Sequence, residues 1–293
     1  MISPILAGSI TALAYAVSTL GSARSSRLAG AIPAVAGVML VGSLLLLPVA
    51  LFVTPIPASP AIPPLSLVWT VVAGVANVCG LLLAYAAYRL GAIAIVSTIG
   101  STEGAIAAVI SVATGQLLAP GAGPALVLVA VGVVLAATSG GHELEEGHAI
   151  SRAQSLRAAA LSFGAACCLG IGLFVAGRVS SSLPPAWVVL PGRLVGVLLV
   201  GVPLVVAGRG RVHVPRGAIP FIAVTGLAEV IGLTSFSVGA RQDIATTSVL
   251  ASMFAPMAAI AAFVLFRERL ARRQIVGIVL VVVGIALLGA VSG

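Results

Sequence analysis

The sequence predicts an all-α integral membrane protein whose ten transmembrane helices form two inverted five-helix repeats. Its composition is the first observation: of 293 residues, 60% are hydrophobic and 8% are charged, with a mean hydropathy of +1.24. A soluble protein carries roughly 25% charged residues, and so few charges cannot cover a water-exposed surface. The second and third observations are ten long apolar runs and an internal repeat. A soluble enzyme, a nucleic-acid-binding protein and a disordered chain are therefore excluded.

Each apolar run is long enough for a bilayer crossing, which takes about 20 residues. Because backbone polar groups cannot stay unpaired in lipid, runs of this length must be helices. They do not alternate in polarity as the strands of a membrane barrel do. The ten runs are residues 2–20, 31–53, 66–88, 92–114, 123–139, 157–177, 186–207, 217–238, 244–266 and 272–291.

The second five runs repeat the first five. A shift of 152 residues places Gly74, Gly80, Gly132 and Arg89 on Gly226, Gly232, Gly284 and Arg241. We expect a first unit at 1–140, a polar linker at 141–156 and a second unit at 157–293. Five is an odd number, so the second unit must enter the bilayer upside down. Two inverted halves around a central site are typical of secondary transporters, which open that site alternately to each side.

The distribution of basic residues predicts the orientation in the membrane. All 15 are Arg; twelve lie in the odd-numbered loops and two in the even-numbered loops. Because cytoplasmic loops carry the excess of basic residues, the odd-numbered loops are predicted to be cytoplasmic. The Lys-free composition, rich in Ala, Gly and Val, indicates a GC-rich bacterial genome. We therefore expect a multi-pass protein of the bacterial cell (inner) membrane.

Three ionisable residues lie well inside apolar runs: Glu103, Arg193 and Glu229. Each costs about 2.5–3.5 kcal/mol at membrane depth. We expect Glu103 and Glu229 to line a cavity, where they bind a cationic or amine-bearing substrate or take up and release a proton. Asn77 is the repeat counterpart of Glu229 and either joins this site or packs helices. Arg193 either joins the site or pairs with one glutamate as a structural bridge.

Aromatic residues complete the expected site, and other kinds of site find no support. Tyr15 and Tyr85 are candidates for stacking on a substrate, whereas Trp69 and Trp187 are expected at the membrane interface. His142 and His148 lie among glutamates in the polar linker, which we interpret as a solvated charge run and not a metal site. No cofactor is expected. No phosphate-binding loop, no catalytic motif and no His within an apolar run is present, so we expect neither an enzyme nor a built-in ATPase.

The end of the second repeat resembles the EamA-type proteins of the drug/metabolite transporter superfamily. It has a small-residue run that begins at Ala245 and ends at Pro256, then Glu268-Arg269-Leu270, Gln274, Gly277 and Gly284. The resemblance extends to the first half, where Gly104 and Gln116 replace Pro256 and Glu268. It implies ten helices, a central cavity and the movement of small metabolites, amino acids or drugs by alternating access. It also implies cytoplasmic termini, whereas the Arg distribution places both termini outside.

The sequence thus predicts a secondary active transporter for a small molecule, most simply an exporter coupled to protons or working by exchange. A membrane-embedded enzyme acting on a lipid or prenyl substrate is the alternative. It would need Asp, His or Lys residues clustered at one interface, where the sequence offers only Arg-rich loops. A receptor or assembly factor would need a larger soluble segment. The expected partners are the substrate and the lipid bilayer, and the sequence does not determine the oligomeric state.

Overall fold

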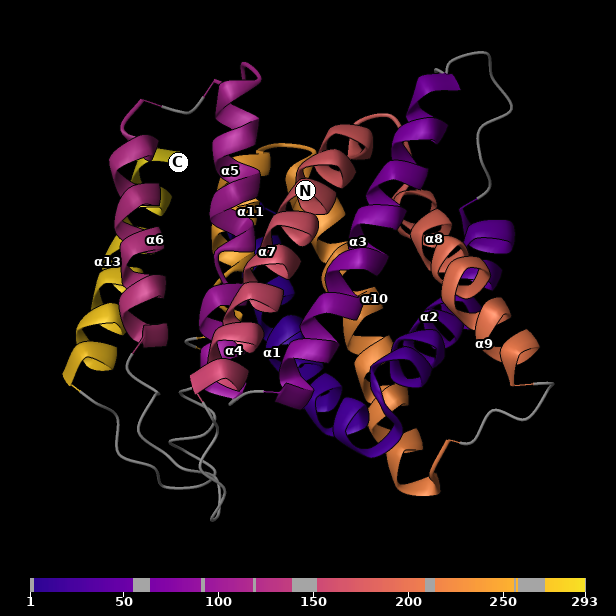
Figure 1. The fold of residues 1–293 in the computed structure, drawn as a ribbon. Helices are drawn as coiled ribbons and strands as arrows, with labels where there is room; N and C mark the ends of the chain where they lie inside the picture. Colours follow the sequence, from indigo (N-terminus) through magenta and orange to yellow (C-terminus); the bar gives the residue numbers. More distant parts are fainter. Residues whose placement is uncertain are drawn as a thin grey trace.

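The computed structural model describes residues 3–54, 64–90, 93–117, 120–138, 152–208, 214–255, 257 and 272–292, and every element in these ranges is helical (Figure 1). The first half contains α1 (Pro4–Ala29), α2 (Ala31–Pro48) with the π-helical turn η1 (Val49–Val53), α3 (Pro64–Leu90), α4 (Ile93–Gly100), α5 (Glu103–Ala113) and α6 (Ala122–Thr138). The second contains α7 (Arg152–Ser180), α8 (Pro185–Gly196) with η2 (Val197–Gly201) and α9 (Val202–Ala207), η3 (Arg216–Ala218), α10 (Ile219–Ala240), α11 (Ile244–Ala251) and α13 (Arg272–Ser292).

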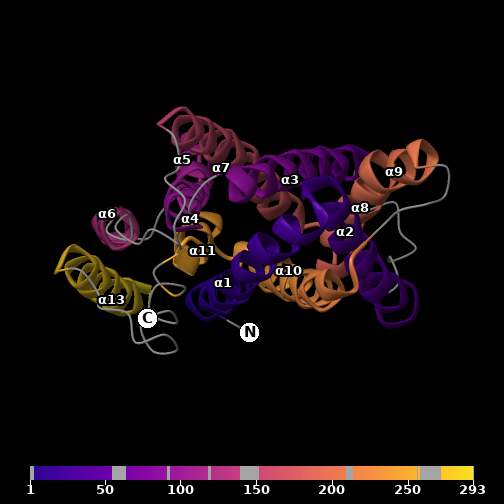
Figure 2. The ribbon, with the colours of Figure 1, turned by 60° about the horizontal axis from the view of Figure 1, so that its bottom comes forward.

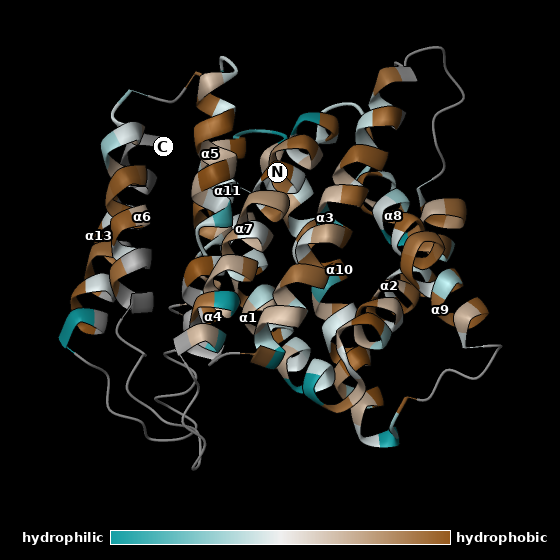
Figure 3. Ribbon diagram, in the orientation of Figure 1, coloured by the Kyte–Doolittle hydropathy of each residue, from teal (hydrophilic) through white to brown (hydrophobic). Residues whose placement is uncertain are grey.

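Within the described residues, six helical segments are long and apolar enough to cross a membrane. They are Pro4–Ala29, Ala31–Val53, Val68–Leu90, Leu156–Ser180, Pro185–Ala207 and Arg216–Ala240. Large apolar side chains cover their outer surfaces, as with Phe52, which is 83% exposed. Hydrophobic residues dominate the helices, and hydrophilic colour gathers mainly near their ends (Figure 3). The prediction of an all-helical, multi-pass membrane protein is confirmed.

The fourth predicted span, residues 92–114, is not one continuous helix. It is divided into α4 and α5 by a turn at Ser101 and Thr102. The Thr102 hydroxyl donates to the Ile99 carbonyl at 2.7 Å, and such local bonds compete with the helical ladder. The ninth predicted span, 244–266, is interrupted similarly by a turn at Ser252 and Met253, and its end lies outside the described residues. The sequence alone did not predict either turn, because each predicted span is apolar on average although residues 97–103 are locally polar.

The helices that correspond under the 152-residue shift run in opposite directions. In Figure 1, α1, α3, α6, α8 and α11 run downward, and α2, α4 with α5, α7, α10 and α13 run upward. Their packing also corresponds: α3 packs against α7 as α1 packs against α10, and α3 contacts α8 as α10 contacts α2. The helices α5 and α11 contact each other, as do α6 and α13. Figure 2 shows the α6–α13 pair at one edge of the bundle.

Glycines permit the closest of these helix crossings. A Cβ atom on Gly80 of α3 would lie 2.5 Å from Leu169 of α7. A Cβ atom on Gly232 of α10 would lie 2.6 Å from Tyr15 of α1. Gly80 and Gly232 are counterparts in the sequence repeat, so the same small residue serves the same kind of crossing in both halves.

Two buried apolar clusters lie at opposite ends of the bundle. The upper cluster joins the upper ends of α7, α8, α10 and α11, and includes Leu173, Val179, Leu183, Val188, Val189, Phe236, Ala240 and Ile244. The lower cluster joins α1, α3 and α4 through Ala23, Ala87, Tyr88 and Val96. The space between the two clusters holds the polar residues described next.

The segment between the two halves is only partly described. Most of the expected linker, residues 141–156, lies outside the described residues, and with it His142 and His148. The helix α7 begins at Arg152 and so takes in the last residues assigned to the linker.

Candidate functional site

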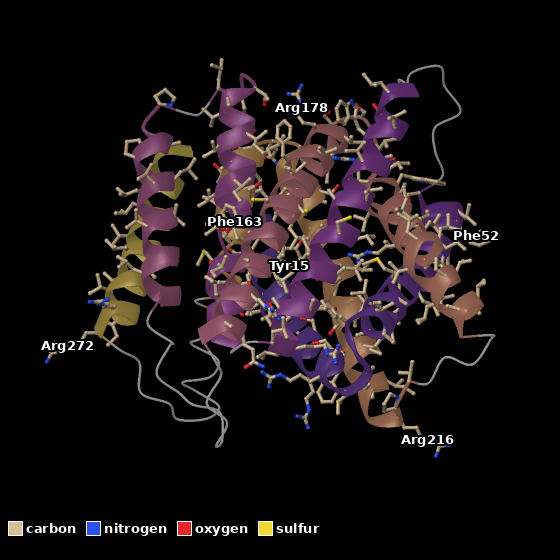
Figure 4. The ribbon with its side chains drawn as sticks, in the orientation of Figure 1. Tyr15, Phe52, Phe163, Arg178, Arg216 and Arg272 are labelled. Atoms are coloured by element: carbon tan, nitrogen blue, oxygen red, sulfur yellow. The ribbon has the colours of Figure 1, made fainter. Side chains whose placement is uncertain are left out.

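A cavity of about 90 Å³ lies inside the helical bundle, between residues of both halves. This volume accommodates several water molecules. All six residues that the sequence suggested for a binding site line it: Tyr15, Asn77, Tyr85, Glu103, Arg193 and Glu229. They come from α1, α3, α5, α8 and α10, and Tyr15 is labelled near the centre of the bundle in Figure 4. Tertiary packing therefore brings together side chains that are up to 214 positions apart.

An ion pair between Arg193 and Glu229 forms one wall of the cavity. The Arg193 Nη2 atom lies 3.2 Å from Glu229 Oε2, and the two side chains are only 1% and 7% exposed. Ser18 of α1 donates its hydroxyl to Glu229 Oε1 at 2.7 Å. Arg193 Nη1 also lies 3.7 Å from the sulfur of Met39. Of the two roles that the sequence left open for Arg193, the structure therefore has the bridge to a glutamate, at the edge of the cavity.

Glycine makes room for this arginine. A Cβ atom on Gly42 of α2 would lie 2.9 Å from Arg193 Cδ. Larger residues at position 42 would push the guanidinium away from Glu229. The α2 helix thus sets the position of the pair although it contributes no charge to it.

Glu103 is the second buried carboxylate, and it is only 4% exposed. It is the first residue of α5, immediately after the turn that ends α4. The positive end of the α5 helix dipole favours a carboxylate at this position. Within the described part of the chain, Glu103 has no salt bridge. It is the one cavity-lining carboxylate without a partner of opposite charge among those residues.

Two close backbone contacts fix the start of α5. A Cβ atom on Gly170 of α7 would lie 2.7 Å from the Glu103 carbonyl oxygen. A Cβ atom on Gly104 would overlap the Ser248 carbonyl oxygen and the Ser252 hydroxyl. The Glu103 backbone is thus held between α7 and α11, and its carboxylate is confined to the cavity wall.

All three tyrosines of the chain line the cavity. The ring of Tyr15 meets the edge of Phe254, with the centroids 6.3 Å apart and the planes at 75°. The Tyr85 hydroxyl is buried and has no hydrogen-bond partner among the described residues. Sequence reasoning missed Tyr88, although it follows Tyr85 by three residues and so shares its helix face. It also missed Phe254 and Ser18, for which the sequence offered no signal.

The remaining aromatic and polar residues take simpler positions. Asn77 is half-buried and lines the cavity from α3. Trp69 is 44% exposed on the outside of α3. The indole N–H of Trp187 donates to the Thr54 carbonyl at 2.7 Å and ties the start of α8 to the end of η1. No group of three or more potential metal ligands occurs among the residues that the structure describes.

The two ends of the cavity differ in polarity. Toward the lower end the lining includes the hydroxyl-bearing residues Thr19, Ser22 and Tyr88. Toward the upper end it consists of Leu173, Val188 and other members of the upper cluster. The lining is thus mainly apolar toward the upper end, whereas toward the lower end it combines buried hydroxyl groups with apolar side chains such as Val96.

A hydrogen-bonded contact lies beyond the upper end of the cavity. The Gln116 side chain, just after α5, donates from Nε2 to Asp243 Oδ1 at 2.6 Å. Asp243 also caps the start of α11 by accepting from the Thr246 backbone N–H at 3.0 Å. We call this contact the Gln116–Asp243 latch. It joins one helix from each half of the chain at the upper end.

An apolar helical bundle around a polar central cavity defines a multi-pass membrane protein. The resemblance seen in the sequence is confirmed: residues 156–290 match the EamA-like transporter family. The matched residues cover most of the second half of the chain. The residues quoted for the resemblance at Pro256 and Glu268–Leu270 lie outside the described residues.

Solved structures extend the likeness to the whole fold. A crystal structure of a protein superposes with a TM-score of 0.73 and 14% sequence identity, over 98% of this chain and 96% of its own. In total, 24 chains of solved structures match. At this identity the likeness shows the fold alone. No curated protein matches the sequence.

Proposed function

We propose that the protein is a secondary active transporter that moves a small metabolite, amino acid or drug-like solute across the membrane by alternating access. The cavity carries this proposal, because it lies between helices of both halves and holds a buried carboxylate that forms no salt bridge with any described residue. Ionisable groups inside a membrane protein mark pathways for substrates or protons. The EamA-like family match over the second half supports the same class.

Two inverted five-helix repeats, 1–140 and 157–293, are part of the proposal. The opposite directions of corresponding helices support it, as does the correspondence of the α3–α7 and α1–α10 contacts. The equivalent glycine crossings at Gly80 and Gly232 support it further. Inverted halves allow a transporter to exchange the conformations of its two repeats and so open one site to either side.

The difference between the cavity ends suggests which state the structure represents. The upper end is closed by the upper cluster and the Gln116–Asp243 latch. The lower part of the cavity lining carries hydroxyl groups, and no hydrogen-bonded contact like the latch lies there among the described residues that line it. We interpret this as a state closed above and leading to the lower side. The opposite state requires the latch to separate and the upper helix ends to part.

The lower side is proposed to be cytoplasmic. Figure 4 places Arg216 and Arg272 at the lower end and Arg178 at the upper end, which fits the excess of Arg in the odd-numbered loops. Loading from the lower side then makes export the natural direction. The Lys-free composition supports a bacterial inner membrane as the location.

Glu103 is the better candidate for coupling to protons. Glu229 already has Arg193 and Ser18 as partners, whereas Glu103 has no salt bridge within the described residues. A proton or a cationic substrate group can each neutralise Glu103, so the two would exchange at one carboxylate. Glu229 would instead keep the cavity wall in place. No observation favours the alternative of a lipid- or prenyl-processing enzyme.

The test begins with a thermal-shift screen of the purified protein against amino acids, amines and small metabolites at two pH values. Ligands that stabilise the protein are then loaded into proteoliposomes, and counterflow of the labelled ligand is measured. We expect ligand-dependent counterflow, and accumulation driven by a pH gradient that Glu103→Gln abolishes. Arg178→Gln, a change at an exposed residue outside the cavity, should behave as the wild type. The proposal would be contradicted by ligands that stabilise the protein but give no counterflow in proteoliposomes into which the folded protein has been inserted.

A further inference from the structure

We propose that the cavity takes a small organic amine with a single positive charge, whose ammonium group binds Glu103 and whose apolar body lies beside Tyr15 and Phe254. This inference rests on the proposed function and names the substrate class of the same site. Three features carry it: the charge balance of the cavity, the engagement of Arg193, and the aromatic groups next to Glu103.

The charges around the cavity leave one negative group without compensation. Arg193 and Glu229 neutralise each other at 3.2 Å, and Glu103 has no salt bridge within the described part of the chain. Buried charges are costly unless they are paired. A substrate with one positive charge makes the loaded cavity neutral. A zwitterion would leave it with one negative charge, and a dication would leave it with one positive charge.

Arg193 already has a carboxylate partner in the protein. Its Nη2 atom is engaged by Glu229, its Nη1 atom lies 3.7 Å from the Met39 sulfur, and its side chain is 1% exposed. A substrate carboxylate that bound Arg193 would compete with Glu229 for the same guanidinium group. The site therefore favours an amine over the amino acid with the same side chain.

The aromatic residues next to Glu103 suit the body of such a ligand. The turn that positions Glu103 begins after Gly100, where an added Cβ atom would lie 3.8 Å from Phe254 Cζ. Phe254 in turn packs edge-on against Tyr15. Aromatic faces attract ammonium groups and pack against apolar rings. Only 4% of the residues are aromatic. The cavity is nevertheless lined by all three tyrosines of the chain.

Acceptors for the ammonium hydrogens are also present. The buried Tyr85 hydroxyl lines the cavity and has no partner among the described residues. A primary ammonium group donates up to three hydrogen bonds, of which Glu103 takes at least one and hydroxyl oxygens can take the rest. The volume of about 90 Å³ limits the ligand to a small amine.

The inference is tested by ranking four ligands that share one ring: 2-phenylethylamine, phenylalanine, 2-phenylethanol and 1,4-bis(aminomethyl)benzene. Their binding to purified protein in detergent at pH 7 is measured by calorimetry. We expect 2-phenylethylamine to bind at least about tenfold more tightly than each of the other three, a difference of about 1.4 kcal/mol. A preference for phenylalanine, or equal binding of the neutral alcohol, would overturn the inference.

Variants identify the group responsible. Glu103→Gln should weaken amine binding at least about tenfold and remove the preference over 2-phenylethanol, whereas Glu103→Asp should keep the ranking. Arg178→Gln is the matched control and should keep both affinity and ranking. Size-exclusion profiles and thermal unfolding establish that each variant is folded. If Glu103→Gln does not fold, the inference is judged from the order of the four ligand affinities in the wild type and in Glu103→Asp. Unchanged amine affinity in folded Glu103→Gln would also overturn the inference.

Because this experiment measures binding, it separates the two proposals. Amine binding at Glu103 without counterflow in proteoliposomes would contradict the proposed function and leave the chemistry of the site intact. Counterflow of other solutes, with no amine preference, would contradict the substrate class and leave the transporter function intact.

Discussion

Arg193 of α8 and Glu229 of α10 form a buried ion pair whose nearest atoms lie 3.2 Å apart. The pair borders the central cavity, and Ser18 of α1 donates to the carboxylate from the other half of the chain. This arrangement gives the two buried glutamates different environments. Glu229 is compensated by Arg193, whereas Glu103 forms no salt bridge with any residue that the structure describes.

Removing one member of the ion pair should destabilise the protein more than removing both. Glu229→Gln leaves the Arg193 charge buried, and such a loss costs about 3–5 kcal/mol. The double change Arg193→Met with Glu229→Gln leaves no unpaired charge and should recover most of that stability. Thermal unfolding of the purified protein measures the difference. A double variant no more stable than Glu229→Gln would contradict a simple charge-pair role.

The crossing of α5 and α11 should not tolerate a larger residue at Gly104. A methyl group there would overlap the Ser248 carbonyl and the Ser252 hydroxyl, and overpacking of this kind costs about 1–3 kcal/mol. At Gly217, by contrast, an added Cβ atom would meet nothing within 4 Å. We therefore expect a lower unfolding temperature for Gly104→Ala and an unchanged one for Gly217→Ala. Equal stability of the two variants would show that α5 and α11 can separate without cost.

The Gln116–Asp243 latch should hold the upper end closed. Gln116→Ala removes the hydrogen bond to the Asp243 carboxylate, worth about 1.5–3 kcal/mol, together with the one accepted from the Ser111 hydroxyl. It should raise the population of the upper-open state at least about tenfold. A cysteine at Val188, in a background without Cys79, Cys167 and Cys168, reports this opening through its reaction with an impermeant thiol reagent added at the upper side. Asp243→Ala is less informative because it also removes the cap of α11. An unchanged labelling rate in Gln116→Ala would remove the latch from the gating mechanism.

Orientation can be read from two loop positions on opposite ends of the bundle. In the same cysteine-free background, Ser182→Cys lies after α7 at the upper end, and Gly217→Cys lies before α10 at the lower end. If the Arg-rich side is cytoplasmic, an impermeant reagent should label Ser182→Cys in intact cells and Gly217→Cys only after permeabilisation. The reverse pattern would place the termini in the cytoplasm, as the family resemblance implied.

Composition and run length were sufficient to predict the membrane class, because in lipid a long apolar run can satisfy its backbone only as a helix. Charged side chains are costly at membrane depth. Glu103, Arg193 and Glu229 could therefore be singled out within those runs. The repeat of Gly80 and Gly232 likewise pointed to close crossings that the structure contains.

The turns at Ser101 and Ser252 were not predicted in this way, because hydropathy averaged over a whole span does not register a short polar stretch such as residues 97–103. Nor could the sequence decide which glutamate pairs with Arg193, since residues 103, 193 and 229 lie on three different helices. Phe254 follows the turn at Ser252 and Met253 that ends α11, and only the tertiary structure shows that its ring meets Tyr15.

The sequence by itself thus determined that the protein lies in a lipid bilayer, that its apolar runs are helical, and which of its residues are too polar for lipid. The tertiary structure decided which of those residues meet. Hydropathy is a property of each residue and its neighbours in the chain, whereas an ion pair or a cavity depends on distances between helices. Those distances are set by close packing at glycines such as Gly42, Gly104 and Gly170, which carry no chemical signal of the site they shape.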